Sequence, residues 1–282
     1  MTKPLYRRHA VQLFLFLSLT AIYPSLLARS AGKKQITKQT LTVNATNPGD
    51  KAFKERNFPK ADSLYTSELQ KNPASTELLG KLSRVQVTLG ESIDFENTDE
   101  RLKHYHKAAE YARAAITLDS TYAKGHSWLA ASLALMADKI GTKEKIKRAH
   151  EIKHELDIAL RLNPNDEVAL SILGSYYHEA SNIGWFKRMV GNAFVGQVPE
   201  GSSELAEHAF RKAIALDPDV IRNYHELALI YFKKDREEDA VSLLKTALEK
   251  PVFLASDKRR VEEIRKLLKK HSQEKEETVN NE

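Results

Sequence analysis

The sequence predicts an all-α fold: a right-handed solenoid of about five helix pairs with intra-repeat insertions and a C-terminal capping helix. Composition is the first observation, because 282 residues hold only 11 Gly and 9 Pro, as is typical of helices joined by short turns. With 41% hydrophobic and 29% charged residues, the chain is too apolar to be disordered and too charged for a polytopic membrane protein. The absence of Cys excludes a disulfide framework, a thiolate metal site and a cysteine nucleophile.

A recurring sequence is the second observation. Each copy ends a helical pattern of small residues three and four apart, and precedes a helix that carries Leu followed by a small residue. Small residues let two helices cross closely, and the Asp or Pro after Leu stops the second helix. This is the tetratricopeptide pattern of helix A followed by helix B. The copies are AITLDS at 115–120, ALRLNP at 159–164, AIALDP at 213–218 and ALEKP at 247–251, with a weaker one ending at Asn72-Pro73.

The spacing of the copies predicts where the repeats are enlarged. Ala213 and Ala247 are 34 positions apart, the standard period, whereas Ala115 to Ala159 is 44 and Ala159 to Ala213 is 54. We expect the extra residues between helix A and helix B of their repeats, with a third insertion at 90–99 in the same place of an earlier repeat. The solenoid should cover residues 48–271, capped by an amphipathic helix at 256–271 and followed by a disordered tail at 272–282.

The first 30 residues predict export. Lys3, Arg7 and Arg8 precede an apolar run at 10–28, and the small residues Ala28 and Ser30 flank Arg29. This arrangement is typical of a secretory signal peptide that is cleaved after Ser30. The protein should then be periplasmic or secreted, with a flexible linker at 31–47. The alternative is a membrane anchor at residues 10–28, since the run approaches the ~20 residues that cross a bilayer.

The basic net charge does not predict a nucleic-acid partner. The first 30 residues hold four of the 44 Lys and Arg and no acid, so the rest has 40 bases and 38 acids, a net charge of +2. The basic run at 143–148 is interleaved with Glu144 and lacks stacking aromatics, which is typical of a solvated helix face.

One motif suggests catalysis. His150, Glu151 and His154 form the H-E-x-x-H pattern of zinc peptidases, in which two His one turn apart bind zinc and Glu activates water. A zinc metallopeptidase is therefore a remote alternative. The inward face of this predicted helix is instead Ile152, Leu156 and Ala159, which leaves the motif on the exposed face. We expect no catalytic residue, no metal and no cofactor.

The expected binding surface is the concave groove, which the outward positions of the A helices line in such solenoids. We expect it to bind a protein or peptide segment. The predicted groove residues are Lys124, Ser127, Ser171, Ser175, His178, Arg222, His225 and Phe232.

The insertion at 183–198 combines Trp185, Phe186 and Phe194 on one predicted helix face with Arg188 on the other. It either packs on its own repeats, or it lines an apolar cleft or touches a membrane while Arg188 meets a phosphate or carboxylate.

Residues 125–199 carry a more specific resemblance. GHSW at 125–128, KIGTKEKI at 139–146 and NIGWFKRMVGNAFVGQVP at 182–199 follow one another within the repeats. Over about residues 100–270 the chain resembles the regulator of microtubule dynamics family, whose tetratricopeptide domain carries the same two insertions.

Two functions remain open. The first is a non-enzymatic scaffold that binds a protein or peptide segment outside the cytoplasm. The alternative is a lipid or apolar-ligand binding module at a membrane, which the resemblance implies because some family members are thought to hold lipid in the groove. Microtubule binding is not expected of an exported chain.

Overall fold

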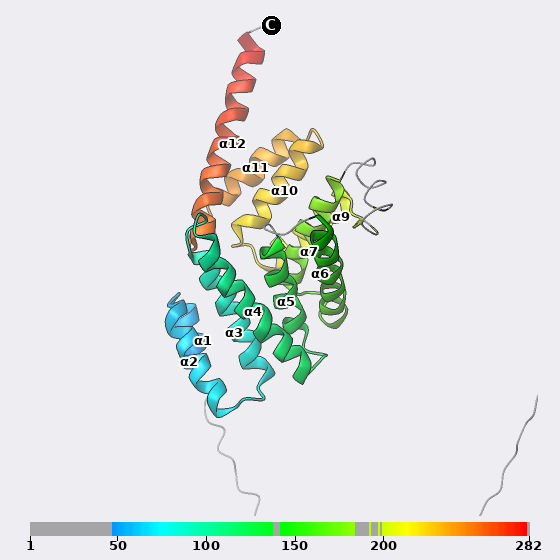
Figure 1. Cartoon of the computed structure of the whole chain (residues 1–282). Helices are drawn as coiled ribbons and strands as arrows, with labels where there is room; N and C mark the ends of the chain where they lie inside the picture. The colour runs from blue at the N-terminus through cyan, green and yellow to red at the C-terminus, as the bar shows by residue number, and fades with distance from the viewer. Residues whose placement is uncertain (1–46, 138–141, 184–191, 193–196, 198, 281–282) are drawn as a thin grey trace, which may run out of the picture. The chain divides into compact units, whose positions relative to one another are not determined.

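The described part of the chain is a stack of helix pairs. The computed structural model describes residues 47–137, 142–183, 192, 197 and 199–280, all within one compact unit, Thr46–Glu282. Every regular element in these ranges is an α-helix (Figure 1). Each A helix is followed by its B helix: α1 (Pro48–Lys54) and α2 (Phe58–Lys71), α3 (Thr76–Ser92) and α4 (Thr98–Leu118), α5 (Ala123–Leu135) and α6 (Thr142–Leu162), α7 (Glu167–Ser181) and α9 (Ser203–Leu216), α10 (Ile221–Lys233) and α11 (Glu237–Leu248). The five predicted pairs of an all-α tetratricopeptide-type solenoid are confirmed.

The helix ends follow the sequence signals. The side chains of Asn47, Ser75, Asp166 and Ser202 accept backbone N–H bonds at the starts of α1, α3, α7 and α9, which satisfies donors that have no partner within the helix. The recurring Leu closes α4, α6, α9 and α11, as the repeated ending predicts.

Small residues hold the helix crossings together. Every B helix carries at least one alanine with no exposed surface, as at Ala61, Ala108, Ala159, Ala213 and Ala247. Gly174 of α7 sits against Phe210 of α9 so closely that an added Cβ would lie 2.8 Å from three ring carbons. Three buried apolar clusters result, within α1–α3, α4–α7 and α9–α12.

The insertions lie between helix A and helix B, as the repeat spacing predicts, but they take two forms. Helices α4 and α6 have 21 residues each, compared with 12 in α11, so much of the added sequence lengthens the B helix. The longest insertion separates the end of α7 at Ser181 from the start of α9 at Ser203.

The C-terminal helix differs from the prediction. Helix α12 (Ala255–Asn280) continues beyond residue 271, so the tail that we expected to be disordered from Ser272 is helical to Asn280. The residues after His271 include Gln, Lys and Glu, which are good helix formers, so their helix propensity favours this extension.

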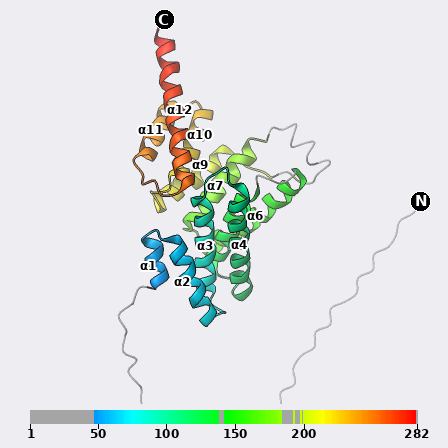
Figure 2. The same cartoon turned by 60° about the vertical axis from the view of Figure 1, so that its left-hand side comes forward.

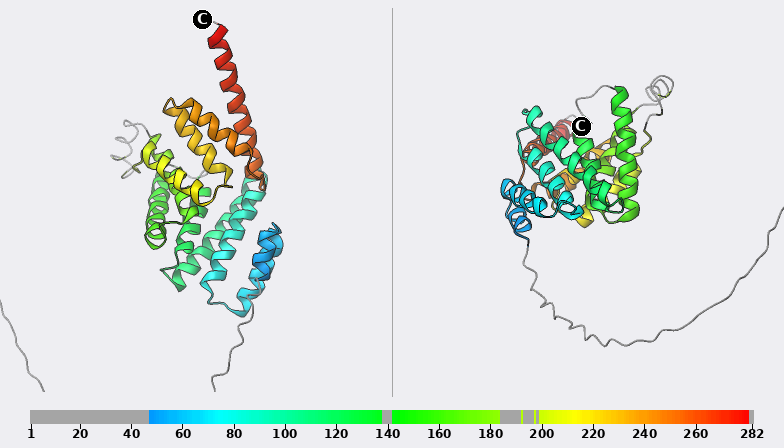
Figure 3. Two further views of the ribbon diagram at one scale, coloured as in Figure 1. Left: turned by 180° about the vertical axis from the view of Figure 1, so that it is seen from behind. Right: turned by 60° about the horizontal axis from the view of Figure 1, so that its bottom comes forward.

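The start of α12 meets the N-terminal repeats. This helix packs along α10 and α11, and its first turns also reach α3, far away in sequence (Figures 2 and 3). The last helix therefore joins the two ends of the stack as well as covering its last repeat. Among the described helices, none has a stretch both long and apolar enough to cross a membrane.

Candidate functional site

A cavity of about 370 Å³ lies among the A helices. Helices α3, α5, α7 and α10 all contribute to its wall, together with Phe53 of α1 and the start of α12. Its volume lies in the range of about 300–1,000 Å³ that is typical of ligand pockets. The apolar part of the wall includes Phe53, Val87, Trp128, Ala131, Leu135 and Ile172.

The connection from α11 to α12 closes one side of this cavity. Leu254, Ser256, Asp257 and Arg260 line it. Outside the cavity, Arg56 stacks on the ring of Phe253, so the α11–α12 connection is held against the first repeat. The cavity wall thus joins segments about 200 positions apart in the sequence.

Glu91 is the centre of the closing contact. Its Oε1 accepts hydrogen bonds from the Tyr105 hydroxyl at 2.5 Å and from Arg101 Nη2 at 2.7 Å. Burial alone would raise the pKa of Glu91, but hydrogen bonds from Tyr105 and Ser256 and the charge of Arg260 hold it below its ordinary value. The ionised carboxylate therefore links α3 and α4 to the first turns of α12.

The polar end of the cavity is built on α7 and α10. Arg222 Nη2 donates to Ser171 Oγ at 2.5 Å, and Ser171 Oγ donates to Asn223 Oδ1 at 2.5 Å. This chain of hydrogen bonds fixes the guanidinium of Arg222 at the cavity wall. Burial lowers the pKa of Arg222, and the positive charge of Arg260 acts in the same direction, while Glu226 and Glu91 oppose the shift.

Of the predicted groove residues, Ser171 and Arg222 line the cavity. Lys124 does not line the cavity, but its Nζ donates to Oε1 of the wall residue Glu167 at 2.8 Å. Ser127 is fully buried and donates to Asp166 Oδ2 at 2.8 Å, so its hydroxyl joins α5 to the start of α7.

The other four predicted groove residues do not line the cavity. Ser175 donates back to the Ser171 carbonyl at 3.4 Å, and His178 is half-buried on the same helix. His225 is buried, and the Phe232 ring lies 5.9 Å from the ring of His271 on α12. The C-terminal helix covers this part of α10, and a pattern based on the repeat alone does not include that helix.

The H-E-x-x-H side chains are engaged separately. His150 Nε2 donates to the Gln197 carbonyl at 2.7 Å, and Glu151 forms an ion pair of 2.7 Å with Arg113 of α4. His154 is exposed. Within the ranges that the structure describes, no three His, Cys, Asp or Glu side chains are grouped as a metal would require. The predicted insertion residues Trp185, Phe186, Arg188 and Phe194 lie outside the described residues.

Sequence reasoning missed the part of the wall formed by α3 and α12. Arg84, Val87, Thr88 and Glu91 come from α3, and Arg260 comes from the helix that we predicted only as a cap. The sequence of α12 shows an amphipathic pattern, but no local signal indicates that its polar face meets a repeat some 170 positions earlier.

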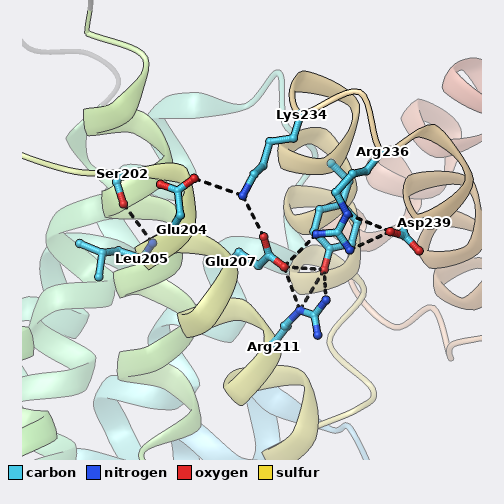
Figure 4. Close-up of polar contacts among 9 residues, drawn as sticks. Ser202, Glu204, Leu205, Glu207, Arg211, Lys234, Arg236 and Asp239 are labelled. Carbon is cyan, nitrogen blue, oxygen red and sulfur yellow. Dashed lines mark hydrogen bonds and ion pairs between the residues drawn. The ribbon is translucent and has the colours of Figure 1, made fainter.

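A second polar cluster joins α9 to the turn between α10 and α11 (Figure 4). The Glu207 carboxylate receives Tyr231 Oη at 3.0 Å, Arg236 Nη1 at 3.1 Å, and Arg211 Nε and Lys234 Nζ at 3.2 Å each. Burial raises the pKa of Glu207, but Lys234, Tyr231 and Arg236 outweigh it and keep the pKa below the ordinary value. Because its own side chains satisfy the carboxylate, this cluster locks two repeats together and has no evident ligand function.

Comparisons with known proteins agree on family and fold. The family model for regulator of microtubule dynamics protein 1-3 matches residues 46–272. Regulator of microtubule dynamics protein 1 of Caenorhabditis elegans is 26% identical over 221 residues, covering 78% of this chain and 96% of that protein. The mouse protein 2 is also 26% identical, over 74% of this chain and 54% of its own length.

A solved structure supports the repeat fold. A thermophilic TPR protein of Thermus thermophilus superimposes with a TM-score of 0.53 at 19% sequence identity, covering 77% of this chain and 94% of its own. At this identity the likeness concerns the fold alone.

Proposed function

The chain belongs to the regulator of microtubule dynamics family, and on that premise we propose that it is a non-enzymatic scaffold that binds a protein or peptide segment in its A-helix cavity. The tetratricopeptide-type fold supports a protein-interaction scaffold in general. The observation that carries the finer proposal is the composition of the wall. Three successive A helices, α3, α5 and α7, present apolar side chains, and α10 adds the polar residues Arg222 and Asn223, as a peptide with both side-chain and polar contacts requires.

A cavity-blocking variant tests this proposal. Thr88 is half-buried and lines the cavity, so Thr88→Trp should fill part of it without replacing a core side chain. Binding is measured as enrichment of random decapeptides on the immobilised full chain. Ser242→Trp is the matched control, because Ser242 is exposed on α11 and is not part of the wall.

The expected result is enrichment by the wild type and by Ser242→Trp, with loss in Thr88→Trp. Circular dichroism must show equal helicity in the three proteins, so that loss of binding reports the cavity rather than unfolding. Enrichment that is unchanged in Thr88→Trp would place the binding surface elsewhere.

A lipid or other apolar ligand is the second candidate. The specific observation in its favour is the apolar part of the wall, with Trp128, Leu135 and Ile172. Mass spectrometry of an organic extract of the purified protein separates the two candidates. The peptide proposal expects no stoichiometric lipid, whereas one lipid per chain would favour the apolar-ligand module.

The place of action is part of the proposal. A cleaved leader at residues 1–30 would put the solenoid outside the cytoplasm, where it would not meet microtubules, although the relatives are named for their dynamics. N-terminal sequencing of the protein from its native host tests the leader. A start at Ala31 supports export, and a start at Met1 or Thr2 supports the anchor.

A further inference from the structure

Two arginines lie together at the polar end of the cavity. Arg222 near the start of α10 and Arg260 of α12 both line it, and the charge of Arg260 is felt at Arg222. We propose that Arg222 and Arg260 form a composite anion subsite that receives the C-terminal carboxylate of a bound peptide. This inference rests on the proposed function and names the chemical group that the site selects.

Neither arginine has a carboxylate partner in the described part of the chain. Among the described side chains, no carboxylate oxygen lies within 4.0 Å of the nitrogens of either guanidinium group. Arg260 Nη1 donates to the Ser256 carbonyl at 3.4 Å. Glu91 is the buried acid that attracts Arg260, but Arg101 and Tyr105 already engage its Oε1. Burial and the charge of Arg260 disfavour the charged form of Arg222, whereas Glu226 and Glu91 favour it, so an anion between the two arginines would add to the effect of these acids.

The remaining carboxylates of the wall have partners of their own. Glu167 pairs with Lys124, and Asp217 Oδ1 accepts the Asp219 N–H at 3.2 Å. Asp257 Oδ2 accepts the N–H groups of residues 253 and 254, at 3.3 and 3.1 Å. Among the described side chains, no ion pair joins any of these three carboxylates to Arg222 or Arg260.

A third arginine of the wall, Arg84, is held differently. Its guanidinium carbon lies 3.8 Å from the centre of the Phe53 ring, and its charge helps to lower the pKa of Asp50. The Arg84 guanidinium therefore stacks on an aromatic ring of the first repeat and has an acid of the same repeat nearby. Arg222 and Arg260 are the pair whose charges an incoming anion would compensate.

The local backbone favours an anion at the same place. Helix α10 begins at Ile221 with no side-chain cap and no acidic residue in its first turn, so no acidic side chain of this turn offsets the positive end of the helix dipole. Arg222 is already oriented by Ser171. A carboxylate that arrives between the arginines would meet preoriented donors and would lose little entropy in ordering them.

The shape of the site favours a chain end over the middle of a chain. The first turns of α12 close the cavity beside Arg260 by contacting α3, and the volume of about 370 Å³ suits a few side chains rather than a long segment. A peptide that ends in an apolar residue would place that side chain against the apolar wall and its carboxylate between the planar guanidinium groups. Because Arg260 belongs to α12, binding of this kind would also hold α12 against the repeats.

Matched peptide libraries test the subsite. Random decapeptides are prepared with a free C-terminal carboxylate or as C-terminal amides, and each library is bound to the full chain. We expect the wild type to prefer free carboxylates about tenfold or more, as charge-assisted hydrogen bonds commonly provide. Arg260→Gln should lose this preference, measured as the ratio of acid to amide binding by the same variant.

Arg265→Gln is the control, because it removes the same charge from an exposed position of α12 and should keep the preference. Arg222→Gln is a second variant, and it is weighed with circular dichroism because Arg222 also donates to Ser171. Preference loss in Arg260→Gln but not in Arg265→Gln supports the subsite.

The contrary outcomes are distinct. Equal binding of acids and amides by the wild type overturns the carboxylate subsite and leaves the proposed function intact. No enrichment of any peptide overturns both. If no peptide binds but decanoate binds better than decanol in an Arg260-dependent manner, the anion is a lipid head group, and the peptide source is overturned.

Discussion

Gly174→Ala should destabilise the protein although alanine is the better helix former. Gly174 lies inside α7, where an added Cβ would be 2.8 Å from three ring carbons of Phe210. The Phe210 side chain is fully buried within the α9–α12 cluster, so the ring has little room to withdraw. Overpacking of this kind costs about 1–3 kcal/mol, and the helix-propensity gain of Ala over Gly offsets about 1 kcal/mol.

Gly125→Ala is the matched comparison, because Gly125 also lies inside an A helix and gains the same propensity. Its added Cβ would meet Ile116 Cγ1 at 3.1 Å, the nearest contact, and that aliphatic side chain can adjust. The free energies of unfolding of the two variants should therefore differ by about 1–3 kcal/mol. At about 2–4 °C per kcal/mol for a unit of this size, Gly174→Ala should melt at least about 2 °C below Gly125→Ala.

The assay is thermal unfolding followed by circular dichroism at a helix wavelength, on the full chain and at one protein concentration. A third variant, Phe210→Leu, completes a double-mutant cycle with Gly174→Ala. Removing the ring should relieve the overlap, with a favourable coupling of about 0.5–3 kcal/mol. The reasoning is refuted if Gly174→Ala melts at or above Gly125→Ala, or if the two substitutions are additive.

Three further predictions concern the motif, a helix crossing and pH. His150→Ala and Glu151→Ala should each change the free energy of unfolding by no more than about 0.5 kcal/mol, since the Glu151–Arg113 pair is at the surface; one tightly bound zinc that His150→Ala loses would contradict this. Ala213→Trp should cost on the order of 3 kcal/mol in urea unfolding, because Ala213 is fully buried at the α9 crossing, and a midpoint equal to the wild type would contradict that packing. Burial lowers the pKa of His225 below its ordinary value of 6.5, so its contribution to stability is present above about pH 6.5 and is lost as the pH falls; His225→Gln should flatten the loss of melting temperature on acidification, and an unchanged slope would contradict it.

The repeat pattern was enough to predict the helix pairs because the signals that define them are local. A small residue at a crossing, Leu and a helix stop follow one another within six positions, so one chain segment specifies each end. The same pattern located the insertions, since only the spacing between copies was needed. The spacing alone does not give the length of α6, but the run at 143–148 was predicted as a helix face, and it lies within α6.

The candidate site was less predictable because its wall depends on the contact between α12 and α3, which lie far apart in the sequence. Ser171 and Arg222 were predicted from their places on the A helices, and both line the cavity. Phe232 and His225 occupy equivalent outward places, but neither lines the cavity: Phe232 lies against His271 of α12, and His225 is buried. Outward positions in a solenoid become groove residues only where no later element packs on them.

The contact between α12 and α3 also makes the C-terminal helix part of the cavity wall. A solenoid whose repeats touch only their neighbours would lose little binding function if its last helix were removed. Here the last helix supplies Arg260, and its first turn contacts Glu91 of α3, so the cavity wall needs both ends of the stack. Contacts that close a long loop must offset more chain entropy than contacts between neighbouring repeats. The Glu91 carboxylate contributes to this because Tyr105, Arg260, Ser256 and Arg101 all favour its ionised form, so a charged group as well as apolar packing stabilises the contact between α3 and α12.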